Sequence, residues 1–367
     1  MKPSLSPRAC KAAGSIIRAW FMAAGVCLGV APTPPAVVRH GTLAATGQYP
    51  PDPVMFLWMP GSMGWPNLRN QPQQSPPSRT TTFETVELSN AYLTARFVPE
   101  FGFRLYDVTW NDESPKRQPF HRADTIEIST LFKWEGLGYY ITFGSMKWGF
   151  PYFGHTPSDH LPWRVTSGVT ADGDAWAEGR YTDIDTRLTS VVRAVLPRGR
   201  AALEFTFSVA NPNDSPTPFD YWIDSLIPNS RHVEFAMPAA EAITHQKGWS
   251  LVRQMFMDWP MHKGLDLRFY KNWGTSQGVF PWKLADGWSA FYDHARQTGA
   301  VRIFPRDKVC GVKYWMPSLD WGGYGEMFGG VDVTQDERRH LQPGQIFAWR
   351  ESWYPIRDLR GVDAADG

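Results

Sequence analysis

The stretch Gly144–Trp163, GSMKWGFPYFGHTPSDHLPW, contains the densest set of side chains that could do chemistry. Its glycines and prolines predict an irregular path rather than a helix. Aromatic rings such as that of Trp148 stand beside the ammonium of Lys147 and the imidazoles of His155 and His160. Flat rings beside polar groups suit a sugar pocket, because a ring stacks on C–H patches while donors and acceptors bind hydroxyls. The alternative is an aromatic core loop whose polar groups satisfy its own backbone.

The two histidines of this stretch are candidate catalytic groups. His155 and His160 lie five residues apart and can supply a base and a hydrogen-bond donor. As zinc ligands they would need further partners, and the chain contains no HExxH motif. We therefore predict neither a metal nor a cofactor.

Two further charged residues precede this stretch. Glu135 is flanked by aromatic residues that include Tyr140, and such surroundings raise a carboxyl pKa to suit a general acid; a solvent-facing turn carboxylate is the alternative. Arg104 can hold a substrate carboxylate or hydroxyl in a bidentate fork. Its alternative role is a structural ion pair with Glu100 or Asp107.

A second aromatic and acidic segment, YWMPSLDWGGYGEMF, is rich in glycine and is our preferred cleft wall outside Gly144–Trp163. Its candidate residues are Trp315, Asp320, Trp321, Tyr324 and Glu326.

Carboxylates also alternate with an aromatic residue in FDYWIDS. Asp224 shares one strand face with Trp222 if the strand is regular, which favours a sheet that meets a polar ligand. Near the C-terminus, Glu351 is interpreted as structural, holding a buried arginine such as Arg350 or another, since buried charges are normally paired.

Composition narrows the class of function. The 37 basic and 36 acidic residues nearly cancel, so no nucleic-acid partner is expected. The 18 tryptophans exceed what a core requires, and carbohydrate clefts are one common use of that surplus. The chain shows no G-x-S-x-G, P-loop or dinucleotide-binding glycine pattern, which disfavours serine hydrolysis and nucleotide chemistry.

The first 31 residues predict an export signal. A basic segment precedes the short apolar run Ala19–Ala31, which is too short to span a bilayer. We expect a periplasmic or secreted protein with no membrane span in the mature chain; a disordered cytosolic tail is the alternative. Cys310 would then be the one cysteine left, in an apolar context typical of an inert buried thiol.

The elements that position these residues are predicted to be strands. From Thr80 onward, short alternating runs follow one another, and TRLTSVVRAVLPRGRAALEFTFSVANPN is the clearest hairpin. No linker or repeat interrupts them. We therefore predict an extended N-terminal arm over 32–80, one all-β supersandwich domain over 81–357 and a tail over 358–367.

Seven segments in a fixed order carry a family resemblance: RFVPEFGFRLYDV, FGHTPSDHLPW, VLPRGRAALEFTFSVANPNDSPTPFDYW, YKNWG, GAVRIFP, GVKYWMP and WRESWYPI. Over about residues 50–357 the chain resembles the family known as domain of unknown function 5107, which is similar to the galactose mutarotase-like supersandwich. The resemblance implies a large antiparallel supersandwich with a carbohydrate in its concave face. Two positions depart from the family pattern, which has a second glycine at Phe103 and tends to carry a glutamate near Lys147.

Taken together, these residues predict an exported protein that binds an oligo- or polysaccharide in an aromatic cleft. The expected reaction is cleavage of a glycosidic link by hydrolysis or elimination, with His155 or His160 as base, Glu135 or Glu326 as acid and Arg104 assisting. A non-catalytic carbohydrate-binding protein and a sugar mutarotase or epimerase are the alternatives. The residues expected to contact the sugar are Trp148, Tyr140, Lys147, Trp315, Asp320, Trp321, Tyr324 and Asp224.

Overall fold

The computed structural model describes residues 33–49, 77–113, 117–129, 140–151, 157–159, 161–245, 256–274, 276–335 and 337–365. The chain divides into Met1–Pro32 and Thr33–Gly367, and the described residues all belong to the second unit. The predicted export signal over 1–31 lies outside them. Within the described part, no helix is long and apolar enough to cross a membrane.

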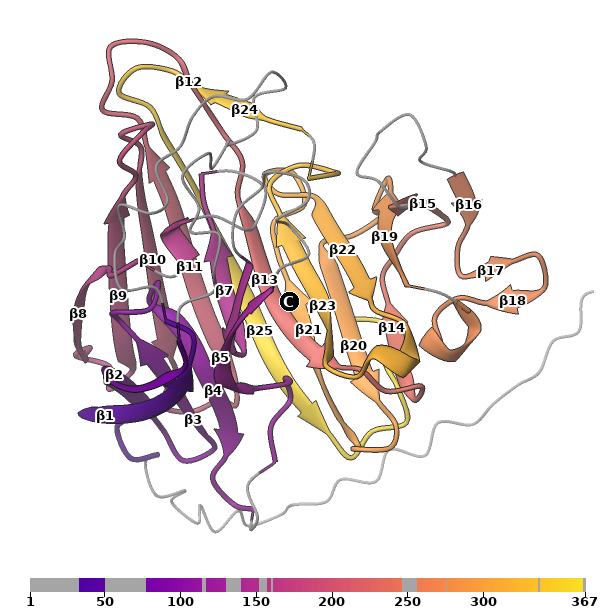
Figure 1. The fold of residues 1–367 in the computed structure, drawn as a ribbon, viewed down its shortest axis with the longest axis horizontal. Helices are drawn as coiled ribbons and strands as arrows, with labels where there is room; N and C mark the ends of the chain where they lie inside the picture. The colour runs from indigo at the N-terminus through magenta and orange to yellow at the C-terminus, as the bar shows by residue number, and fades with distance from the viewer. Residues whose placement is uncertain are drawn as a thin grey trace, which may run out of the picture. The chain divides into compact units, whose positions relative to one another are not determined.

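Strands build almost all of the regular secondary structure in the described part of the chain (Figure 1). The larger sheet contains, in spatial order, β16 (Phe256–Asp258), β15 (Glu241–His245), β19 (Gln277–Trp282), β22 (Gly311–Met316), β23 (Tyr324–Gly330), β13 (Trp222–Pro228), β7 (Met146–Gly149), β4 (Arg104–Trp110), β3 (Leu93–Val98), β2 (Arg79–Ser89), β1 (Val37–Gly47), β5 (Ala123–Ser129) and β6 (Tyr140–Gly144). The smaller sheet contains β14 (Val233–Ala236), β20 (Trp288–Asp293), β21 (Thr298–Ile303), β25 (Ile346–Arg357), β11 (Leu203–Ala210), β10 (Thr189–Leu196), β9 (Ala175–Thr182) and β8 (Arg164–Val169).

Short elements connect these strands. They are the two-stranded ladders β12 (Thr217–Phe219) with β24 (Arg339–Leu341) and β17 (Met261–His262) with β18 (Leu265–Asp266), and the 3-10 turns η3 (Pro157–Asp159), η5 (Tyr270–Asn272) and η6 (Leu319–Trp321). The described pairings are antiparallel except for the single contact between β1 and β5. The prediction of a large antiparallel sandwich is confirmed.

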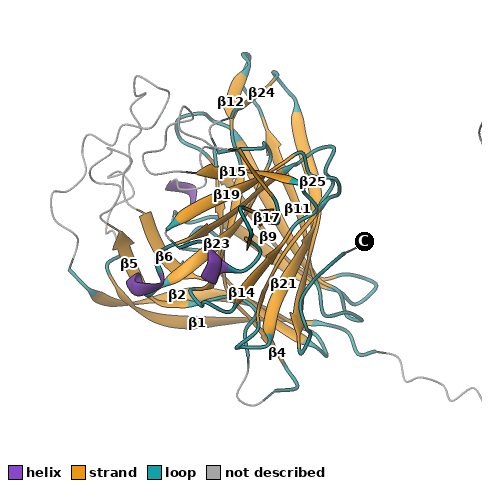
Figure 2. Cartoon of the chain, turned by 90° about the vertical axis from the view of Figure 1, so that its right-hand side faces the viewer, coloured by secondary structure: helices purple, strands orange, loops and turns teal. Residues whose placement is uncertain are grey.

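The core lies between the two sheets and follows from the period-two alternation of the strands. In β11, Leu203, Phe205, Phe207 and Val209 are all buried, as the hairpin pattern predicts. Their rings meet those of the larger sheet, since Trp148 lies 5.4 Å from Phe205 and 5.7 Å from Phe207 between ring centroids. Figure 2 shows the two sheets packed face to face.

One buried ion pair crosses this core. The guanidinium of Arg302 donates to both carboxylate oxygens of Glu351, at 2.7 and 2.6 Å, and both side chains are fully buried. The indoles of Trp349 and Trp353 also donate to this carboxylate. Glu351 therefore pairs with a buried arginine, as its sequence context indicates, and the arginine is Arg302.

The segment predicted as an arm contributes a full strand. Val37–Gly47 pairs with Arg79–Ser89 along its whole length. Most of its side chains are exposed, so it has little of the apolar alternation that marks a strand in a sequence. Its backbone ladder holds it on the sheet.

Asn90 joins two turns that are far apart in the sequence. Its amide nitrogen donates to the carbonyl oxygens of Pro197 and Arg200, and its Oδ1 accepts from the backbone N–H groups of Tyr92 and Leu93. Because these groups are largely buried, we expect Asn90→Ala to lower the free energy of unfolding by about 2 kcal/mol, measured by urea denaturation. Asn90→Asp keeps the acceptor but sets a carboxylate oxygen against the carbonyl oxygens of Pro197 and Arg200, so at pH 7 it should be no more stable than the alanine variant. An unchanged stability in both variants would contradict this role.

Candidate functional site

The face of the larger sheet that points away from the smaller one carries the charged residues of the central strands. We call it the distal face, and its members include Arg104, Lys147, Asp224, Trp315 and Glu326. Their neighbours in sequence, such as Met146 and Met327, point into the core between the sheets. Strand alternation therefore separates an apolar face from a charged one.

The strand register brings these residues together. Lys147 on β7 stands opposite Asp224 on β13, and Glu326 on β23 stands opposite Leu226, two residues further along β13. Trp315 on β22 is the other cross-strand neighbour of Glu326. Residues that are opposite or diagonal on one face lie within side-chain reach of each other.

Lys147 links two carboxylates. Its Nζ donates to Oδ2 of Asp159 at 2.9 Å and lies 3.6 Å from Oδ2 of Asp224. All three residues are buried, with Lys147 only 4% exposed. The ammonium is therefore held at the centre of the distal face.

Arg104 fixes the backbone around this centre. Its guanidinium donates to the carbonyl oxygens of Phe143 at 2.6 Å and Asp159 at 2.7 Å, and it lies over the ring of Phe101. Of the partners predicted from sequence, Asp107 pairs with Arg96 and Glu100 accepts from the backbone N–H of Glu84, while the carboxylate of Asp159 lies 4.0 Å from the Arg104 guanidinium. Arg104 serves here to hold η3 and β6 beside the cluster.

Gly102 allows η3 to approach. It has a φ of +70°, and an added Cβ would lie 2.4 Å from the carbonyl oxygen of Asp159. We expect Gly102→Ala to lower the free energy of unfolding by about 2 kcal/mol or more, because of the strained φ and this clash. Thermal denaturation checks the loss of stability. Gly199→Ala is the control, since nothing lies within 4 Å of a Cβ there; equal losses in both variants would contradict the explanation.

The carboxyl group of Asp224 has a raised pKa. Burial, together with direct interaction with the Glu326 carboxyl, raises the pKa of Asp224 well above its ordinary value, and Lys147 and Arg104 offset only part of this rise. The cluster therefore places two carboxyl groups, those of Asp224 and Glu326, side by side on the distal face.

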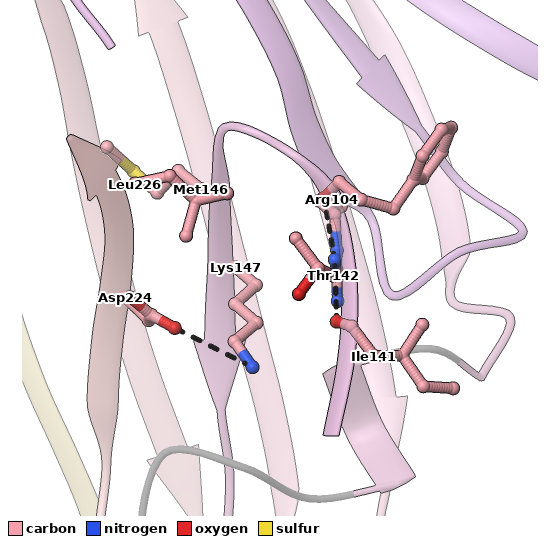
Figure 3. A pocket seen from close by; sticks show the side chains of 8 residues that line it. Arg104, Ile141, Thr142, Met146, Lys147, Asp224 and Leu226 are labelled. Carbon is pink, nitrogen blue, oxygen red and sulfur yellow. Dashed lines mark hydrogen bonds and ion pairs between the residues drawn. The ribbon is translucent and has the colours of Figure 1, made fainter. Parts of the chain in front are cut away.

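A small concavity opens beside this cluster. Figure 3 shows Lys147 reaching toward Asp224 on one side of it, with Thr142 and Arg104 on the other. The hydroxyl of Thr142 lies 2.6 Å from that of Tyr324, which connects the pocket to β23. Apolar side chains such as Ile141 and Leu226 together with a few placed polar groups line this concavity, and that combination is the ordinary form of a small-molecule site.

A second buried cluster lies on the same face, and sequence reasoning missed it. Lys313 donates to Oε1 of Gln335 at 2.6 Å, and its ammonium lies over the rings of Phe280 and Phe328. Burial and Lys313 lower the pKa of nearby His245 to about 2, so the imidazole is neutral. The alternation in GVKYWMP, which puts Lys313 and Trp315 on one face, is the signal that could have found it.

Several predicted sugar contacts are placed elsewhere. Trp148 is fully buried in the core, where its indole donates to the carbonyl of Phe103, and it does not line the pocket. The reason is that Lys147 and Trp148 are consecutive in a strand and must face opposite sides. Asp320 is exposed in η6, away from the contacts of Lys147 described above.

Some candidates lie beyond what the structure describes. His155, His160 and Glu135 fall outside the described residues, so their catalytic roles remain predictions. Tyr140 begins β6 and Trp321 ends η6, but their side chains are not among those described. Within the described part, no three His, Cys, Asp or Glu side chains are arranged to hold a metal ion.

The fold matches solved structures. A TPR-domain containing protein from Parabacteroides distasonis aligns with a TM-score of 0.73 at 16% identity, over 88% of this chain and 56% of that chain, so this chain spans little more than half of its length. A galactose mutarotase-like protein from Clostridium acetobutylicum gives 0.54 at 11% identity over 75% of this chain and 96% of that one. A galactose mutarotase related enzyme from Lactobacillus acidophilus gives 0.52 at 13% identity over 76% and 100%. The architecture is therefore galactose mutarotase-like.

The sequence itself identifies the family. No curated protein matches the chain. The family model described as Domain of unknown function (DUF5107) matches residues 66–348, which is most of the chain and includes six of the seven segments. This protein belongs to the DUF5107 family.

Proposed function

We propose that this protein binds a carbohydrate at the pocket on the distal face and acts on it by proton transfer. The observation that carries the proposal is the buried cluster of Arg104, Lys147, Asp159, Asp224 and Glu326 beside that pocket. Buried ionisable groups with perturbed pKa values gather at functional sites, since stability alone rarely favours them.

The roles follow from the contacts. Asp224 is the protonated acid and Glu326 the acceptor beside it, while Lys147 keeps the pair balanced in charge. The hydroxyls of Thr142 and Tyr324 supply polar groups beside the sugar, and Arg104 holds the backbone around them. The galactose mutarotase-like neighbours support a sugar as the ligand by analogy of fold.

The contact between the two carboxyl groups bears on the reaction class. Hydrolysis with a carboxyl pair needs the groups about 5–9.5 Å apart, on either side of the glycosidic bond. Asp224 and Glu326 interact directly and so behave as one acid–base unit. This favours proton transfer within one sugar unit, as in a mutarotase, where the O1 hydroxyl loses a proton while the ring oxygen O5 gains one. The C1–O5 bond then opens to the free aldehyde and re-forms from the other face. Cleavage of a glycosidic link, the reaction expected from sequence, would need a further group such as Glu135 or His155.

Three readouts on one sugar panel separate these reactions. The protein is incubated with monosaccharides, oligosaccharides and polysaccharides that include uronic acid polymers. Anomer exchange by NMR, new reducing ends, and the absorbance near 235 nm of an unsaturated uronate are followed together. Exchange or epimerisation without new ends supports the proposal, and new ends alone or with that absorbance indicate a hydrolase or a lyase. If no reaction and no binding occurs with any sugar, the proposed function is wrong.

The place of action is part of the proposal. The basic segment and apolar run before residue 32 support export to the periplasm or medium. Fractionation of cells that express the whole chain, with N-terminal sequencing of the product, tests it; an uncleaved protein retained in the cytoplasm would contradict it.

A further inference from the structure

An aromatic pair, one ring exposed and the other half-buried, stands at the edge of the larger sheet. Phe256 lies on β16, the terminal strand, and 59% of it is exposed to solvent. Its ring stands edge-on to that of Trp282 on β19, with centroids 5.2 Å apart and planes at 87°. Contiguous exposed apolar surface marks ligand grooves and interaction sites, and here the exposed ring of Phe256 continues into the half-buried ring of Trp282.

Polar groups surround this pair. The register places Glu241 opposite Trp282, and Asp258 opposite Glu241, and both carboxylates are exposed. The ammonium of Lys283 lies 5.9 Å from the ring of Trp282. Aromatic faces bordered by exposed carboxylates and an ammonium suit a sugar unit, whose C–H face stacks while its hydroxyls take hydrogen bonds.

The pair lies on the distal face, the same face as the pocket. Glu326 stands opposite Trp315, and Trp315 stands opposite Gly278 on β19. Trp282 follows Gly278 by four residues on that strand, so its side chain shares the face. Two strand spacings and four residues separate the Glu326 and Trp282 backbones, which is about 10 Å across the strands and about 13 Å along them.

We propose that Phe256 and Trp282 form a second sugar subsite, so that the ligand is an oligosaccharide extending from the pocket to the edge of the sheet. This rests on the proposed function, because it assigns the pocket to one end of the same ligand. The proposal predicts that affinity rises with the number of sugar units until the oligosaccharide reaches Phe256 at the edge of the sheet.

The test is calorimetric titration of the full-length protein with sugars of one to eight units. The sugars are of the type that binds in the panel described above. Phe256→Ala is the main variant, since an exposed side chain can be shortened without disturbing the fold, and Trp282→Ala is the second. Each should weaken binding of the long ligands about tenfold and leave monosaccharide binding unchanged. Tyr92→Ala removes an aromatic side chain that is 42% exposed at the turn between β2 and β3, and is the matched control.

The outcomes separate the two proposals. Length-dependent affinity that is lost in Phe256→Ala and kept in Tyr92→Ala supports the subsite. Equal affinity for short and long sugars, or no effect of Phe256→Ala, overturns the subsite and leaves the pocket assignment intact. Dissociation of an oligomer by Phe256→Ala without a change in sugar affinity also overturns it, because the pair would then be a protein interface. If no sugar of any length binds, both the subsite and the proposed function are wrong.

Discussion

Replacing Asp224 by asparagine is expected to make the protein more stable than the wild type above about pH 5, by a margin that grows with pH. The pKa of Asp224 is raised in the folded state from an unfolded value near 3.8, chiefly by burial. The contribution of Asp224 to the free energy of unfolding is therefore fully present below about pH 4. It is lost as the pH rises through the pKa that Asp224 has in the folded protein. The wild-type free energy of unfolding should fall by up to about 1.4 kcal/mol per pH unit from this group.

Urea denaturation of both proteins from pH 4 to pH 9 measures this difference. Asparagine has the shape of the protonated acid but does not titrate. The free energy of unfolding of the variant should therefore fall less steeply with pH than that of the wild type. Asp320→Asn, which changes an exposed carboxyl in η6, is the control and should follow the wild-type curve. Parallel curves for the wild type and Asp224→Asn would show that Asp224 is ionised in the fold, and the assignment of the acid would be wrong.

Replacing Lys147 by methionine is expected to lower the free energy of unfolding by about 3–5 kcal/mol at pH 7. The change removes the cation that bridges Asp159 and Asp224 and leaves a buried carboxylate without it, which is the costly way to break a buried pair. Chemical denaturation measures the loss. Arg193→Met breaks a partly exposed pair with Glu178 and should cost less than about 1 kcal/mol.

The double variant Lys147→Met with Asp159→Asn separates charge from packing. If the cost comes from an uncompensated carboxylate, the second change should recover part of the stability, and a double-mutant cycle gives the coupling. Additive losses would contradict the electrostatic explanation.

The hairpins and the sheet-on-sheet architecture could be predicted because their signals are local. Alternation in β10 and β11 gives both the strand and its buried face, and a Pro-Arg-Gly turn separates the two strands. The buried role of Glu351 was also predictable, since a charge between tryptophans needs a partner.

The composition of the site was not predictable, because it depends on which strands become neighbours. Asp224 and Glu326 are far apart in the chain and meet through the pairing of β13 with β23. Alternation shows that Lys147 and Trp148 face opposite sides, but not which side is the core. The strand Val37–Gly47 was missed because most of its side chains are exposed and its pairing is by backbone.

The measurement that tests the central claim most directly compares sugar binding and turnover by the wild type and Asp224→Asn at pH 7. Asparagine keeps a hydrogen-bond donor at the pocket but has no acidic proton to transfer. The variant should bind the sugar with an affinity within a few-fold of the wild type, while its turnover falls about 10²–10⁴-fold. Equal turnover by both proteins, or binding without turnover by the wild type, would contradict proton transfer by the Asp224–Glu326 pair.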